Sequence, residues 1–180
     1  MQDPTPITWQ DGVTLLNDAN FNTEIRNAYL LMLNPPICML TRSTNFSVPN
    51  GASWTAISWD TTALADTEAP VDPMFASGSP TRITVRTAGW YECLINVGSL
   101  LPQNIIMTFG LRVNGTTVYA LGSSFGQNVT VHRICSASML LSLAVTDYVE
   151  VVAQHNDTVA RTVEALGNMP NFALYRRRGI

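Results

Sequence analysis

The stretch that decides the fold is IIMTFGLRVNGTTVYALG, which runs from Ile105 to Gly122. Its first half places apolar residues at every second position, at Met107, Phe109, Leu111 and Val113. This period of two puts one apolar face on a β-strand. Asn114-Gly115 interrupts the alternation, and both residues tolerate the positive φ of a type I′ turn. TTVYAL then returns as the partner strand, so the stretch predicts a β-hairpin.

Similar patterns flank the hairpin on both sides. In GWYECLINVG one alternating set is predicted to face the core, namely Tyr91, Cys93, Ile95 and Val97. Other predicted strands are ICMLTRS, SWTAISWD, RITVRT, NVTVHRICSASMLLSLAV, DYVEVVAQHN, ARTVEAL and FALYRRR, whereas TTALADTEAPVDPMFASGSP predicts a long loop over 61–80. Nine or ten strands spaced roughly 8–14 residues apart indicate an all-β sandwich or barrel.

The composition indicates an unusual surface. Charged residues make up 13% of the 180 residues, about half of the ordinary share of roughly 25%. We therefore expect much of the outer surface to be buried against other chains. The net charge of -3 argues against non-specific electrostatic binding of nucleic acid. All ten basic residues are arginine, which is typical of a GC-rich genome.

Residues 1–36 differ from the rest of the chain. PTPITWQDG reads as an extended arm, and a helix is predicted over about 18–33, with an apolar stripe at Phe21, Ile25, Ala28 and Met32. Pro35-Pro36 ends it. So short a helix is marginal alone, and it must dock on something. The sequence predicts two parts, 1–36 and 37–180, with neither a secretory signal nor a membrane span.

The order of motifs after Pro36 resembles the jelly-roll module of the C1q and tumour-necrosis-factor-like superfamily. The matching motifs are Ala88-Gly89-Trp90-Tyr91, Leu111 to Gly115, and Leu141 to Val151 with Asp147. The resemblance implies an all-β jelly-roll sandwich that forms a homotrimer. It also implies aromatic residues in the core or on the three-fold axis; the candidates are Tyr91, Phe109, Tyr119, Tyr148, Phe172 and Tyr175.

The N-terminal segment is similar to the leader of virion proteins from actinobacterial tailed phages. The residues that fit are Trp9, Gly12, Asn22, Ile25, Arg26, Pro35 and Pro36. The resemblance implies a minor tail or head-decorating protein that is held on the particle by its first 36 residues. The candidate anchoring residues are Trp9, Phe21, Ile25, Arg26, Tyr29 and Met32.

Residues that carry chemistry are few. His132 and His155 lie on different predicted strands, and a metal pair would need Asp157 or Cys135 as a third ligand. GSSFG at 122–126 reads as a loop and does not match a nucleophile elbow. The carboxylates of DTEAPVD (66–72) could ligate a cation, but their spacing is not that of an EF-hand. We expect no enzyme activity, no cofactor and no metal.

Three further features have structural readings. Cys38, Cys93 and Cys135 are an odd number without a C-x-x-C motif, so buried free thiols are expected. Four N-x-S/T sequences begin at Asn45, Asn114, Asn128 and Asn156, and they are interpreted as turn chemistry. Arg176 to Arg178 are too few for a nucleic-acid surface and suit a solvated tail, a neutralised C-terminal carboxylate or a partner's acidic patch.

Together these patterns predict a non-enzymatic virion structural protein that is assembled in the host bacterial cytoplasm. Its expected partners are two further copies of itself and other phage virion proteins. Two alternatives stay open. One is a receptor-binding module in which loops such as 66–80 or 98–104 grip a host-surface glycan or protein. The other is a secreted C1q-like binding protein.

Overall fold

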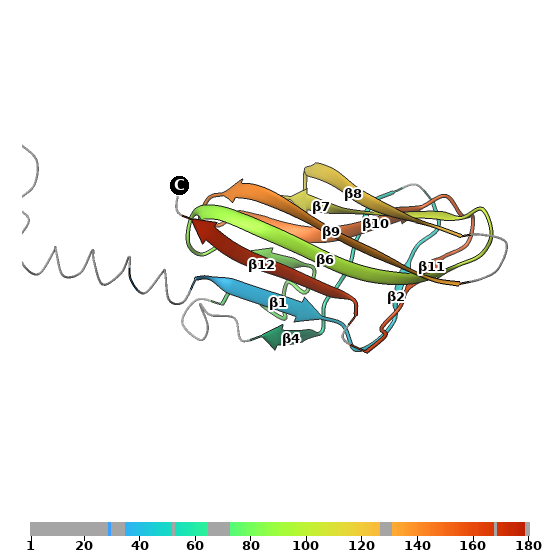
Figure 1. Ribbon diagram of the computed structural model, residues 1–180, viewed down its shortest axis with the longest axis horizontal. Helices are drawn as coiled ribbons and strands as arrows, with labels where there is room; N and C mark the ends of the chain where they lie inside the picture. The colour runs from blue at the N-terminus through green and yellow to red at the C-terminus, as the bar shows by residue number, and fades with distance from the viewer. Residues whose placement is uncertain are drawn as a thin grey trace, which may run out of the picture. The chain divides into compact units, whose positions relative to one another are not determined.

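The computed structural model describes residues 35–51, 53–64, 73–126, 131–167 and 169–178, together with Tyr29. Twelve strands lie in these ranges, all within the compact unit Pro36–Ile180, and they form two antiparallel sheets. Figure 1 shows the two layers of the sandwich. The predicted all-β jelly-roll sandwich is confirmed.

The seven-stranded sheet is built around the two longest strands, β6 and β9. Its members are, in order, β2 (Phe46–Val48), β11 (Arg161–Val163), β6 (Gly89–Leu101), β12 (Asn171–Arg178), β1 (Ile37–Thr41) and β4 (Thr61–Leu64), with β9 (Val131–Leu143) also paired to β6. The strands β6 and β9 run side by side along the length of the domain (Figure 1).

The five-stranded sheet covers one face of the first. Its members are β3 (Thr55–Ala56), β10 (Tyr148–His155), β7 (Ile106–Val113) and β8 (Thr117–Phe125), with β5 (Arg82–Thr84) also paired to β10. The hairpin predicted from Ile105–Gly122 is the β7–β8 pair. Asn114 and Gly115 have φ values of 51° and 71°. The Thr116 N–H donates to the Val113 carbonyl at 3.1 Å, as the type I′ turn requires.

The core lies between the two sheets, and the alternation read from the sequence places it correctly. Tyr91, Cys93, Ile95 and Val97 of β6 are all buried, as are Met107, Phe109 and Leu111 of β7. The Tyr91 hydroxyl reaches the Thr87 carbonyl at 2.6 Å, so the buried ring keeps its polar end satisfied. All three cysteines are buried and free, as predicted.

Three strand predictions are corrected. The nine or ten expected strands are twelve among the described residues. The predicted strand over 53–60 is only Thr55–Ala56. Ile57 still donates to the Val151 carbonyl of β10 at 2.9 Å, but the Trp59 N–H donates to the Pro80 carbonyl at 2.7 Å instead. Proline has no N–H for a ladder. The predicted loop over 61–80 begins with β4, an edge strand of sequence TTAL that pairs with β1 through its backbone.

The predicted N-terminal helix over about 18–33 lies outside the described residues, apart from Tyr29. The division into 1–36 and 37–180 therefore stays a prediction. Among the residues that the structure describes, no helix has the length and hydropathy to cross a bilayer.

Candidate interaction surfaces

The outer face of the seven-stranded sheet carries large apolar side chains that point away from the core. Tyr91 is buried and pairs with Leu141, so the next positions, Trp90 and Leu140, point outward. Leu140 is 51% exposed and Ile134, also on β9, is 57% exposed. The same pairing pattern puts further half-buried side chains on this face, namely Ile37, Met39, Leu94, Leu100 and Tyr175. We call this surface the outer face.

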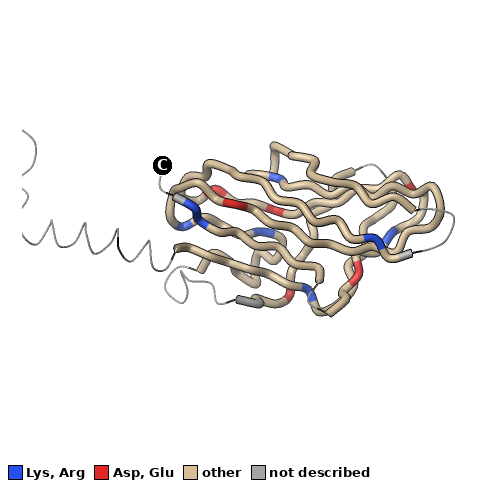
Figure 2. The backbone as a smooth tube through the Cα atoms, viewed as in Figure 1, with Lys and Arg blue, Asp and Glu red and all other residues tan. Residues whose placement is uncertain are grey.

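The outer face is poor in charge. Figure 2 shows long stretches of β6, β9 and β12 without charged residues. The only carboxylate on β6 is Glu92, which accepts from Arg177 Nε at 2.6 Å. This pair neutralises the two charges near one end of the face. The rest of the face therefore resembles the apolar core of an interface more than an ordinary solvated surface.

A broad hollow of about 540 Å³ lies in the middle of the outer face. Most of the residues that line it on β6, β9 and β12 are small or polar; the lining residues are Leu94, Ile95, Asn96, Ser136, Ala137, Ser138 and Asn171. The Ser136 hydroxyl donates to Asn96 Oδ1 at 3.0 Å, so part of the polar floor is satisfied within the chain. Small residues between larger apolar ones make the face uneven, so that side chains of another surface can pack into it.

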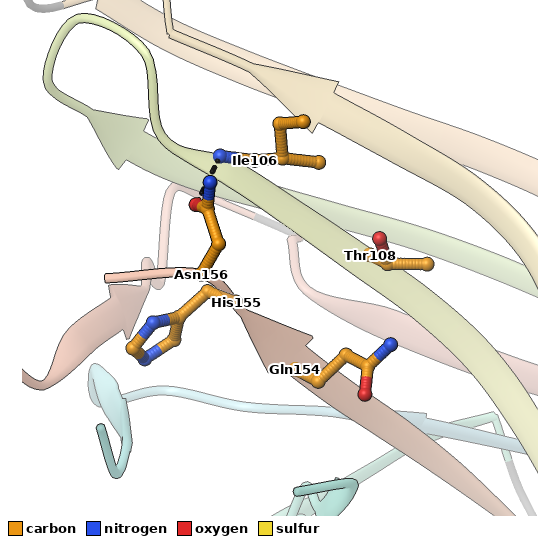
Figure 3. Close-up of a pocket in the computed structure, with 5 residues that line it drawn as sticks. All are labelled: Ile106, Thr108, Gln154, His155 and Asn156. Atoms are coloured by element: carbon orange, nitrogen blue, oxygen red, sulfur yellow. Dashed lines mark hydrogen bonds between the residues drawn. The ribbon is translucent and has the colours of Figure 1, made fainter. Parts of the chain in front are cut away.

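A smaller hollow of about 200 Å³ lies on the five-stranded sheet (Figure 3). It is lined by Ile106 and Thr108 of β7 and by Gln154, His155 and Asn156 at the end of β10. The side-chain Oδ1 of Asn156 accepts from the Ile106 N–H at 2.8 Å. The Gln154 amide makes no side-chain hydrogen bond to the residues that the structure describes. Beside the hollow, Ile106 pairs with Phe125, and both are about half exposed.

The two histidines lie on different sheets. His132 on β9 is exposed, and its Nδ1 lies 2.6 Å from Glu164 Oε2. His155 on β10 is buried; its Nδ1 accepts from the Asp157 N–H at 3.2 Å, and its Nε2 lies 3.2 Å from the Val48 carbonyl oxygen. Within the described ranges no group of three His, Cys, Asp or Glu side chains is placed to hold a metal ion.

The reading of GSSFG as a loop is wrong, because β8 continues through Phe125. Gly122 is instead packed against Cys135: a Cβ there would lie 2.6 Å from its sulfur. The glycines allow a close approach of strands rather than a flexible turn. The acidic stretch 66–72 lies outside the described residues, and of the loop 66–80 proposed as a receptor contact only 73–80 is described. Most of the loop 98–104 is the end of β6.

The arginines near the C-terminus belong to β12 rather than to a free tail. Arg176 Nε donates to the Ala88 carbonyl at 3.1 Å, and Arg177 pairs with Glu92. The backbone continues as a strand through Arg178. Three of the four asparagines of the N-x-S/T sequences lie at a turn or directly beside a strand end, namely Asn45, Asn114 and Asn156, and each accepts a backbone N–H from a residue distant in sequence.

The predicted aromatic packing residues fall into two groups. Tyr91, Phe109 and Phe172 are fully buried in the core, whereas Tyr119, Tyr148 and Tyr175 are half-buried. A role on a three-fold axis stays a prediction for all six. Of the candidate anchoring residues only Tyr29 is described. The other five, Trp9, Phe21, Ile25, Arg26 and Met32, lie outside the described residues.

The sequence reading missed Ile134 and Leu140. The signal was present in RICSASMLLSL, where Ile134 and Leu140 fall in the alternate phase to the core residues Cys135 and Leu141. A strand with apolar residues in both phases is covered on both faces. That pattern predicts a second buried face.

The perturbed titratable groups have structural causes. Burial, with a smaller effect from the charge of Glu92, raises the pKa of the Cys93 thiol to about 12. Burial also raises the pKa of Cys135. These thiols are therefore protonated near neutral pH and are poor nucleophiles.

Comparison with known proteins gives a fold. No protein-family model matches the sequence, and no curated protein sequence matches it either. Among solved structures, the chain is similar to the Eiger TNF of S. frugiperda, with a TM-score of 0.58, 12% identity and coverage of 81% of this chain and 94% of that one. It is also similar to murine APRIL at pH 5.0, with a TM-score of 0.54, 11% identity and coverage of 79% and 98%.

The globular domain of the zebrafish complement 1qA protein aligns with a TM-score of 0.48 and 16% identity, over 79% of this chain and 98% of that one. The first two likenesses, together with the two antiparallel sheets, establish the architecture. The described domain has the jelly-roll fold of C1q and TNF-like domains.

Proposed function

We propose that this protein is a non-enzymatic homotrimeric surface component of a bacteriophage virion, built to associate through the outer face of its jelly roll. The observation that carries the proposal is the exposure of Ile134 and Leu140 on a charge-poor sheet face. Burying a large aliphatic side chain contributes about 1.5–3 kcal/mol. Two such residues in each of three copies are a substantial driving force.

A closed ring of three copies accounts both for the uneven apolar surface of the outer face and for the low charge content of the chain. In a cyclic trimer each subunit presents one surface to one neighbour and a different surface to the other. The outer face, with its hollow of about 540 Å³, supplies one of these surfaces. The similarity in fold to TNF and C1q domains supports the same arrangement.

The virion setting rests on the sequence of residues 1–36, which is similar to the leaders of phage virion proteins. In this proposal the arm and helix bind a head or tail protein, and the jelly roll projects from the particle. The lack of lysine fits a phage of a GC-rich host. Assembly takes place in the host cytoplasm, where buried free thiols remain reduced.

Light scattering tests the association. The full-length protein should have the mass of three chains at micromolar concentration. Ile134→Glu together with Leu140→Glu should reduce it to one chain, because buried unpaired carboxylates oppose association. Val145→Glu together with Val159→Glu is the matched control, since both valines are about half exposed but lie outside the β-strands. A trimer that survives the first pair would reject this face as the interface.

Immunogold electron microscopy tests the virion setting. Antibodies raised against residues 36–180 should decorate intact phage particles at regular positions on the head or tail. Particles assembled without the protein should show no label. Labelling confined to host membranes or to the culture medium would favour the secreted C1q-like alternative.

A second candidate function, receptor binding, is favoured by the hollow in Figure 3. Thr108, Gln154 and Asn156 offer uncharged hydrogen-bonding groups there, next to the exposed Phe125 ring. Such a combination suits a neutral host-surface sugar, which needs hydrogen bonds to hydroxyls and an apolar platform. Gln154→Ala should then weaken binding of the trimer to host cells, whereas Gln103→Ala, at an exposed loop position, should not.

A further inference from the structure

Three buried polar groups without a partner lie at one end of the sandwich. The side chains of Ser99 and Ser124 are 0% and 4% exposed, and neither hydroxyl makes a hydrogen bond. The Nε of Arg133 is also inaccessible and unbonded. Folded proteins pair nearly all of their buried polar atoms with protein groups, water or ions. Three such groups at one place therefore imply a missing partner.

The strand register brings the three side chains together. Ser99 and Arg133 are directly opposite each other in the β6–β9 ladder, on the side that faces the core. The strands β8 and β9 lie against each other at the edge of the sandwich, where Gly122 touches Cys135. Ser124 lies two positions after Gly122 on β8, and Arg133 lies two positions before Cys135 on β9. Each therefore points to the same side of its strand as Gly122 or Cys135, so Ser124 and Arg133 lie close together.

No carboxylate of the described residues compensates the charge of Arg133. Seven other arginine side chains each donate to a carboxylate, a hydroxyl or a carbonyl, namely Arg42, Arg82, Arg86, Arg112, Arg161, Arg176 and Arg177. Arg133 does none of these. Its neighbour His132 points to the opposite face of β9, where it meets Glu164. A half-buried cation is costly unless an anion accompanies it.

We infer that Ser99, Ser124 and Arg133 bind a small oxyanion, such as the phosphate or carboxylate group of a small molecule. The guanidinium fork matches two oxygens of such a group, and the two hydroxyls donate to the others. Of the three guanidinium nitrogens of Arg133, only Nε is both buried and without a hydrogen bond. The two Nη atoms have no hydrogen bond to a described residue either, so they are in contact with solvent. The Nη atoms are therefore the part of the site that an anion in solution can reach first.

A thermal-unfolding titration of the full-length protein tests the site. Inorganic phosphate is added at constant ionic strength, with sodium chloride as the balancing salt. At about a hundredfold excess over Kd, the midpoint should rise by about 5–10 °C. Arg133→Met keeps the aliphatic stem and should abolish the rise. Arg177→Met removes the same charge from an exposed position and should retain it. No rise in the wild-type protein would overturn the proposal.

The two serines give an independent readout if Arg133→Met fails to fold. If the site binds an anion, equilibrium dialysis with radioactive phosphate should find one phosphate ion per wild-type chain. Ser99→Ala together with Ser124→Ala should then weaken this binding at least tenfold. If the hydroxyls bind only water, the double variant should be destabilised equally in chloride and in phosphate. If they bind nothing, it should be as stable as the wild type or more stable. Either of the last two results would reject the site, and neither depends on the oligomeric state.

Discussion

At the scale of single residues, the β7–β8 turn shows how backbone geometry fixes sequence. Gly115 has a φ of 71°, and a Cβ there would lie 2.8 Å from the Tyr148 hydroxyl. Gly115→Ala should therefore lower the free energy of unfolding by about 1–2 kcal/mol, measured by urea denaturation. Gly78→Ala is the control, because Gly78 has open space around it and no positive φ. Equal effects of the two changes would refute this account of the turn.

Asp157 links stability to pH. Desolvation raises its pKa, but hydrogen bonds from Arg161 and from the amides of Thr158 and Val159 lower the pKa below its ordinary 3.8. Because the folded-state pKa lies below the unfolded one, the stabilisation is complete above about pH 3.8 and is lost as the pH falls through the folded value. Asn cannot titrate. Asp157→Asn should thus be less stable than the wild type at pH 7, and the difference should shrink below pH 3.8.

Urea unfolding across pH 3 to 7 measures this difference. Arg161→Gln removes the partner instead of the carboxylate, and it should reproduce most of the loss at neutral pH. A stability difference between the wild type and Asp157→Asn that stays constant down to pH 3 would show that the loss arises from packing and not from the charge.

At the scale of the strand, β9 separates the requirements of folding from those of association. Leu141 is 7% exposed in the core, and its neighbour Leu140 is 51% exposed on the outer face. Leu141→Ala should cost about 2–5 kcal/mol of unfolding free energy through loss of burial and the remaining cavity. Leu140→Ala should leave the monomer's stability almost unchanged but raise the dissociation constant of the assembly. Chemical denaturation and sedimentation, applied to both variants, distinguish the two effects.

The elements that the sequence predicted well are those in which local pattern and tertiary environment agree. Strand β6 alternates because one set of its side chains meets the core, and the β7–β8 hairpin is marked by the signature of its turn. Strand β4 was missed because an edge strand needs backbone partners and little side-chain burial, so Thr61–Leu64 carries no apolar rhythm. Strand β3 was predicted too long because the chain beyond it leaves β10 and Trp59 bonds to Pro80, which is remote in sequence.

The candidate surfaces were less predictable than the fold for a physical reason. Exposure of Ile134 depends on which side of β9 meets the second sheet, and only the pairing with β6 fixes that side. The cluster of Ser99, Ser124 and Arg133 joins three strands, and no spacing along the chain marks it. Composition, in contrast, is sensitive to the whole surface: a charged share of 13% gave the expectation of a covered face before any strand was placed.

At the scale of the whole molecule, the proposed function divides the chain into an anchor and a self-associating domain. Removal of residues 1–35 leaves every described strand and the outer face intact. The truncated protein should therefore keep the mass of three chains in light scattering, while failing to join particles when it replaces the full-length protein during phage assembly. The apolar interface also predicts that the mass is insensitive to salt between low and physiological ionic strength. A monomeric truncated protein would place the trimer contacts in the arm, and the exposure of Ile134 and Leu140 would then need a different occupant. A truncated protein that still joins the particle would instead move the attachment surface onto the jelly roll.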